Sequence, residues 1–132
     1  MSKYIFVKTI EALIQSELAL KVKNSYRRIK EEERSLMRLK QTDSFLSSYN
    51  EIIRYMFIIT LNSEYDIKQS KVHYALKIFL TTYLCIEEND ISNLIAARHA
   101  MKYHGSFPPF RLRVLIKSIT KDLSLVYQQK MA

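Results

Sequence analysis

Residues 89–121, NDISNLIAARHAMKYHGSFPPFRLRVLIKSITK, contain the single glycine and both prolines of the 132-residue chain, and two of its three histidines. Gly105 predicts the end of a helix, because helices commonly stop at a glycine. Pro108 and Pro109 lack amide hydrogens and disfavour a helical backbone before them, so they predict a rigid extended link. A second helical pattern follows from about Phe110. This stretch therefore predicts two helices joined by a fixed elbow.

The 104 residues before Gly105 contain neither glycine nor proline. β-Hairpins and bulges need residues that tolerate positive φ, so this absence favours helices. A hydrophobic fraction of 48% is sufficient for a buried core at this chain length. We therefore predict an all-α fold in one domain, residues 1–132, with five to six helices in a bundle.

Apolar residues recur at helical spacing along the chain. We favour one long, bent helix over residues 3–40; the alternative is two helices that separate near Asn24. Thr42, Asp43 and Ser44 offer an N-cap to a helix that is apolar on more than one face, which predicts a central position. After a break at residues 62–63, Asp66 is expected to cap a fourth helix that ends near residue 86. Asn89 or Asp90 is expected to cap a fifth helix over residues 91–104, and a sixth runs over 110–129.

The formal charge is +8 and the isoelectric point is about 9.6, and two segments carry the whole excess. Residues 21–40 hold eight Lys and Arg against three Glu, and residues 91–132 hold seven Lys and Arg against one Asp. Clustered positive charge suits an anionic partner, which could be nucleic acid or an acidic membrane or protein surface. In the first segment the run of Glu31, Glu32 and Glu33 partly neutralises the helix through i,i+4 pairs, so we interpret that segment as a solvated surface.

The predicted fourth and fifth helices and the polar turn between them, residues 67–104, have the proportions of a helix-turn-helix, in which the second of two helices enters a major groove of DNA. Arg and Asn suit contacts to base edges, and Lys and Arg on the last helix suit phosphates. The turn lacks the glycine often found there, and an ordinary helical hairpin fits the same pattern. The predicted nucleic-acid-binding residues are Asn93, Arg98, His99, Lys102, Arg111, Arg113, Lys117 and Lys121.

Two family resemblances use the same segment. VHYALKIFL followed by DISNLIAARHAMKYHG is similar to the C-terminal DNA-binding domain of the bacterial replication initiator DnaA, which implies roles for Arg98, His99 and His104, although the paired glycines and the acidic residue of that family are missing. The five residues between Arg98 and His104 also resemble the Arg-x4-6-His motif of HEPN-type ribonucleases. That resemblance implies phosphate binding by Arg98 and proton transfer by His104.

A further alternative is a protein-interaction module, an adaptor or inhibitor without catalytic activity, that uses exposed Phe107 and Phe110 as contact points. The apolar face of the first helix would also suit a homodimer. We expect binding rather than catalysis, and we expect no cofactor and no metal site, because His99 and His104 are five residues apart and Cys85 is the single cysteine.

Cys85 lies in an apolar run, which predicts a buried structural thiol. His73, near the start of an apolar helix, is expected to be partly buried and hydrogen-bonded. No apolar run reaches the roughly 20 residues that span a bilayer, and no signal-peptide pattern is present, so we expect a cytoplasmic protein without membrane association.

Overall fold

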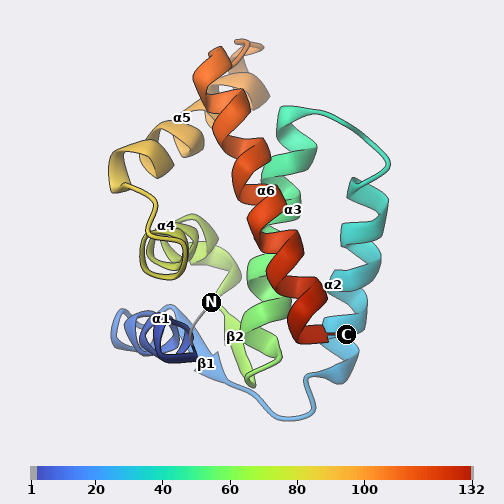
Figure 1. The fold of residues 1–132 in the computed structure, drawn as a ribbon, viewed down its shortest axis with the longest axis vertical. Coiled ribbons are helices and arrows are strands. Elements are labelled where there is room, and N and C mark those ends of the chain that lie inside the picture. The colour runs from blue at the N-terminus through green and yellow to red at the C-terminus, as the bar shows by residue number, and fades with distance from the viewer. Residues whose placement is uncertain (1–2, 132) are drawn as a thin grey trace.

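The computed structural model describes residues 3–131, and the apolar helix α3 (Phe45–Leu61) lies at its centre (Figure 1). Fourteen of its 17 residues are buried. Ser44 caps this helix as predicted: its Oγ accepts the Ser47 N–H at 3.1 Å, and Ser47 Oγ accepts the Ser44 N–H at 3.1 Å. This reciprocal pair satisfies two amide groups that a helix start leaves unpaired. The central position predicted from the apolar pattern is confirmed.

The other helices surround α3. Helices α2 (Tyr26–Leu39) and α6 (Phe110–Met131) pack along it, and α1 (Lys3–Gln15) packs on α4 (Val72–Tyr83) at one side (Figure 1). Helix α5 (Glu88–His104) follows α4 and leads through the proline link into α6. Residues 3–131 thus form a bundle of six helices, which confirms the all-α prediction.

The prediction of one long helix over residues 3–40 is wrong, because residues 16–25 form a loop and a short strand between α1 and α2. Strand β1 (Ala19–Lys21) pairs antiparallel with β2 (Tyr65–Ile67), so that Leu20 faces Asp66. Glu17 and Asn24, on either side of β1, have φ values of 58° and 56°, which turn the chain out of the helical path. Leu18 and Ala19 are therefore buried from a loop and a strand rather than from a helix face, while Leu20 is exposed.

Several predicted boundaries also change. Asp66 lies in β2 instead of capping α4, which begins at Val72 after the 3-10 turn η1 (Gln69–Lys71). Helix α4 ends at Tyr83, and α5 begins at Glu88, three residues before the predicted start. The predicted stop at Gly105 is confirmed: its φ is 66°, and its N–H donates to the carbonyl oxygen of Ala100.

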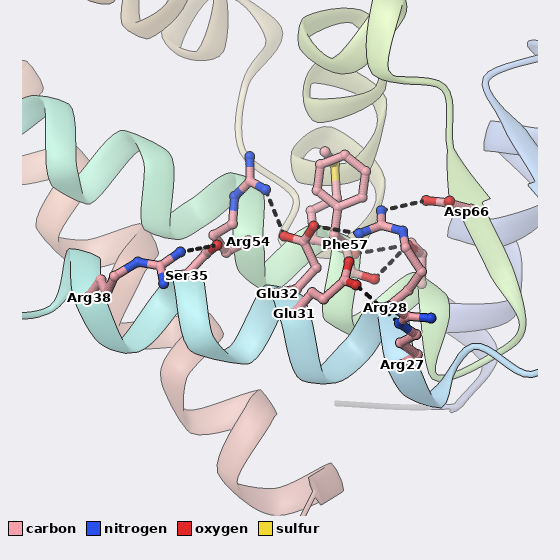
Figure 2. A network of polar contacts seen from close by, with 11 residues as sticks. Arg27, Arg28, Glu31, Glu32, Ser35, Arg38, Arg54, Phe57 and Asp66 are labelled. Atoms are coloured by element: carbon pink, nitrogen blue, oxygen red, sulfur yellow. Dashed lines mark hydrogen bonds and ion pairs between the residues drawn. The ribbon is translucent and has the colours of Figure 1, made fainter.

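Glu32 corrects our interpretation of the Glu31–Glu33 run as solvated charge, because its side chain is 6% exposed. Its carboxylate accepts Arg28 Nη1 at 2.8 Å and Arg54 Nη1 at 2.7 Å, while Arg28 Nη2 donates to Asp66 at 3.2 Å (Figure 2). Both guanidinium groups also lie over the Phe57 ring, at 5.7 and 5.3 Å from its centroid. These side chains, which we call the Glu32 network, join α2, α3 and β2.

Cys85 is exposed, which contradicts the predicted buried thiol. It follows the end of α4 in the turn of residues 84–87, and its φ of 56° is in the left-handed region. This backbone turns the chain toward α5 and carries the thiol away from the apolar face of α4. The turn thus has a left-handed residue where a glycine is often found, with cysteine in its place.

Candidate nucleic-acid interface

Basic and aromatic side chains share the exposed face of α6. Leu112, Ile116, Ile119 and Leu123 are buried against the core, so the residues on the opposite side of this helix face solvent. Helical steps of three or four residues place five side chains on that side: Phe110, Arg113, Val114, Lys117 and Lys121. The sequence has no Asp or Glu from Gly105 to Lys121, so every charged side chain that α6 itself contributes to this part of the face is positive.

A groove lies at the start of this face, beside the proline link. It has a volume of about 600 Å³, and its lining includes Phe45 of α3, Met101 of α5, Pro108 of the link and Ile116 of α6. The residues that open it to solvent are Phe107, Phe110, Arg113 and Val114, and we call this site the aromatic groove.

Arg113 lies between the two phenylalanines of the aromatic groove. Its guanidinium carbon is 5.4 Å from the Phe107 ring centroid and 5.5 Å from that of Phe110. Both distances are within the range of cation–π attraction. The rings remain 76% and 71% exposed, so the arginine contacts them and leaves most of their surface open.

Two cations of the predicted site have carboxylate partners. Lys117 pairs with Asp43, and Arg111 pairs with Asp90 in the first turn of α5. Such exposed pairs contribute little to stability, so an anionic ligand can replace the carboxylate at small cost. Within residues 3–131, Lys102, Arg113 and Lys121 form no ion pair.

Helix α5 presents a separate exposed group near its C-terminus. The His99 ring is 4.7 Å from that of Tyr103 and 5.9 Å from that of His104, measured between centroids, and Lys102 Nζ lies 5.5 Å from the Tyr103 centroid. The two imidazoles thus approach each other despite their spacing of five. A group of three or more metal-ligating side chains does not occur among the described residues. Asn93 is exposed on α5, two turns before this group.

Arg98 points toward the core instead of joining these residues. Its guanidinium carbon is 5.4 Å from the centroid of the buried Tyr49 ring, and the Tyr49 hydroxyl is 2.8 Å from His73 Nδ1. The partly buried, hydrogen-bonded His73 that we predicted is therefore present. Burial, together with the positive charges of Arg98 and Lys102, lowers the pKa of His73. Burial raises the pKa of Tyr49 to about 12, with Arg98 opposing the shift, so its hydroxyl stays protonated at neutral pH.

The structure thus divides the predicted site. Arg113, Lys117 and Lys121 lie together on α6, and His99 and Lys102 lie together on α5. Arg111 binds Asp90, while Arg98 stacks on Tyr49. Arg98 and His104 are six residues apart on one helix, which separates their directions by about 120°. Arg98 lies over the buried Tyr49 ring and His104 lies beside His99, so these contacts do not pair Arg98 with His104 as the ribonuclease resemblance implies.

A search for similar proteins gives no identification: no known family, no curated protein and no solved structure matches the chain. The helices of residues 3–131 include none that is long and apolar enough to cross a membrane. The function must therefore be inferred from the site itself.

Sequence reasoning did not find the carboxylates that contact the site. Asp43 and Asp90 are 74 and 21 residues from their partners Lys117 and Arg111. The local sequence of Asp43 indicates a helix cap, and nothing in it indicates contact with α6. The sequence predicts exposed Phe107 and Phe110 as contacts for a protein, but their position beside Arg113 depends on the fold of the link.

Proposed function

We propose that this protein binds nucleic acid through the exposed face of α6, with Lys102 of α5 contributing at its side. The observation that supports this most directly is the row of Arg113, Lys117 and Lys121. These three cations are exposed at successive turns of one helix, and only the exposed carboxylate of Asp43 competes for them among the described residues. Phosphate groups are the natural partners of such a row.

The positive field also extends to α5. Burial lowers the pKa of His73, the positive charges of Arg98 and Lys102 lower it further, and neither cation forms an ion pair among the described residues. A helix-turn-helix mode through α5 is less well supported, because Arg98 lies on the core side and leaves Asn93 as the predicted base-reading residue that is exposed. We therefore assign the phosphate contacts to α6 first.

The test is binding of fluorescently labelled DNA and RNA, measured by anisotropy at two salt concentrations. We expect affinity that falls steeply as salt increases, because bound cations displace counterions from the phosphates. The variant Lys102→Glu/Lys121→Glu should weaken binding more than tenfold and reduce the slope of log affinity against log salt by about two.

The matched control is Lys21→Glu/Lys23→Glu. These lysines are also exposed and without an ion pair among the described residues, and they belong to β1 and the loop after it, at the other end of the molecule from the start of α6 (Figure 1). The control changes the net charge equally and should retain most of the affinity. Equal losses in the two variants would show a non-specific charge effect, and no binding at low salt would refute the proposed function.

A further inference from the structure

The aromatic groove and the cations beyond it form one continuous surface along α6. We propose that unpaired bases of a single-stranded nucleic acid stack on Phe107 and Phe110, while Lys117 and Lys121 bind the adjacent phosphates. This inference rests on the proposed function and specifies its substrate as single-stranded. Duplexes would contact the cations alone, because their bases are already stacked on one another.

Both phenylalanines of the aromatic groove are mostly exposed to solvent. Aromatic rings are among the side chains that gain most from burial, yet Phe107 and Phe110 remain 76% and 71% exposed on either side of Arg113. Adjacent exposed apolar side chains commonly mark a binding surface. Every base has a flat aromatic face, so stacking on such rings is favourable and tolerant of sequence.

The positions of both rings are set by contacts that exist without a ligand. Arg113 contacts both rings, and the buried Pro108 fixes the backbone between them. A ligand therefore loses little conformational entropy of the protein on binding. The guanidinium between the rings is itself planar, so it can stack with a base while its charge attracts a phosphate.

Charge distinguishes the occupant. A second copy of the chain would place a positive surface against a positive surface, since each copy carries a net charge of +8. Nucleic acid brings the opposite charge together with aromatic rings. Residues four apart on α6 are about 6 Å apart along its axis, so Arg113, Lys117 and Lys121 can meet successive phosphates of an extended strand.

The experiment compares wild type with Phe107→Ala/Phe110→Ala, using labelled oligonucleotides of about 12 nucleotides as single strands of DNA and RNA and as the corresponding duplexes. Loss of base stacking should weaken single-strand binding by about tenfold for each ring. Duplex binding should change by less than about threefold. Circular dichroism should be unchanged, because both rings are on the surface.

The matched control is Tyr26→Ala/Tyr74→Ala, which removes two rings that are 72% and 71% exposed on other helices. It should leave both affinities unchanged. If duplex and single strand bind wild type and the Phe107→Ala/Phe110→Ala variant equally well, the stacking assignment fails while the proposed function stands.

Absence of binding to every oligonucleotide at low salt would refute both proposals. Self-association that is lost in Phe107→Ala/Phe110→Ala would assign the groove to a second copy and overturn the single-strand proposal. Tight binding of an acidic, apolar peptide in preference to any oligonucleotide would overturn it in favour of a protein partner.

Discussion

Arginine side chains lie over phenylalanine rings in two regions with opposite surroundings. In the Glu32 network, Arg28 and Arg54 share the Phe57 ring, which is fully buried, and both bind the carboxylate of Glu32. In the aromatic groove, Arg113 lies between two exposed rings and forms no ion pair within residues 3–131. The same pair of side-chain types stabilises the fold where a carboxylate is present. Where none is present, it leaves charge and aromatic surface available to a ligand.

The largest expected difference between the regions is in the phenylalanines. Phe57→Ala should reduce the free energy of unfolding by about 3–5 kcal/mol, because it leaves a cavity in the core and removes the ring on which two arginines lie. Phe110→Ala should change it by less than about 0.5 kcal/mol, since that ring is mostly in water. Urea unfolding followed by far-UV circular dichroism measures both. A loss of similar size for Phe110→Ala would show that the aromatic groove is part of the structural core, like the Phe57 site.

The next difference concerns the carboxylate. Glu32→Gln should reduce the free energy of unfolding by about 2–3 kcal/mol, because the partly buried Arg54 loses its carboxylate partner and Arg28 keeps only Asp66. The control Glu31→Gln removes a carboxylate that is 46% exposed and 3.7 Å from Arg27, so it should cost less than about 0.5 kcal/mol. The same urea titration compares the two variants. Equal losses of unfolding free energy in Glu32→Gln and Glu31→Gln would mean that burial of Glu32 does not strengthen its ion pairs.

Oligonucleotide affinity provides the converse measurement. Neither Glu32→Gln nor Glu31→Gln should change the affinity for oligonucleotides at a temperature where both variants are folded. The Glu32 network joins α2, α3 and β2 and lies apart from the exposed face of α6. If Glu32→Gln strengthened binding as much as the removal of an acidic residue from α6 would, the two regions would not be separate.

The features that sequence predicted are those determined by local pattern. Helix α3 is apolar on more than one face, which indicates a central position whatever its neighbours are. Gly105 and the two prolines determine the elbow and thereby the exposure of Phe107 and Phe110, because glycine and proline restrict the backbone directly.

The features that sequence missed depend on partners far along the chain. Strand β1 exists because β2, more than 40 residues later, pairs with it, and Glu17 and Asn24 adopt left-handed backbones without the signal of a glycine. Burial of Glu32 requires Arg54 from another helix. The sequence does not predict that Arg98 points toward the core. Helix α5 buries only Ile91 and Leu94, so its apolar pattern does not define which face packs on the core.

Arg98 is intermediate between the two regions, and it provides the prediction with the smallest effect. Like Arg113 it has no carboxylate partner among the described residues, but like Arg28 it stacks on a buried ring. Its charge lowers the pKa of His73, after the larger effect of burial. Arg98→Met keeps an apolar contact with Tyr49 and removes the charge, so the pKa of His73 should rise while staying below its ordinary value. NMR titration of the imidazole resonances measures this shift, and Lys121→Met is the control, since Lys121 does not contribute to the His73 shift.

The sign of the accompanying stability change follows from linkage. Because the folded state lowers the pKa of His73, the unfolded state binds protons more readily. The stability contributed by neutral His73 is therefore present above the unfolded pKa of about 6.5 and is lost as pH falls below it. Arg98→Met should reduce the loss of unfolding free energy that protonation of His73 causes at low pH. An unchanged His73 pKa would mean that the charge of Arg98 is already neutralised, as in the Glu32 network. A raised pKa would instead place Arg98 with Arg113, as a cation whose charge the fold leaves available.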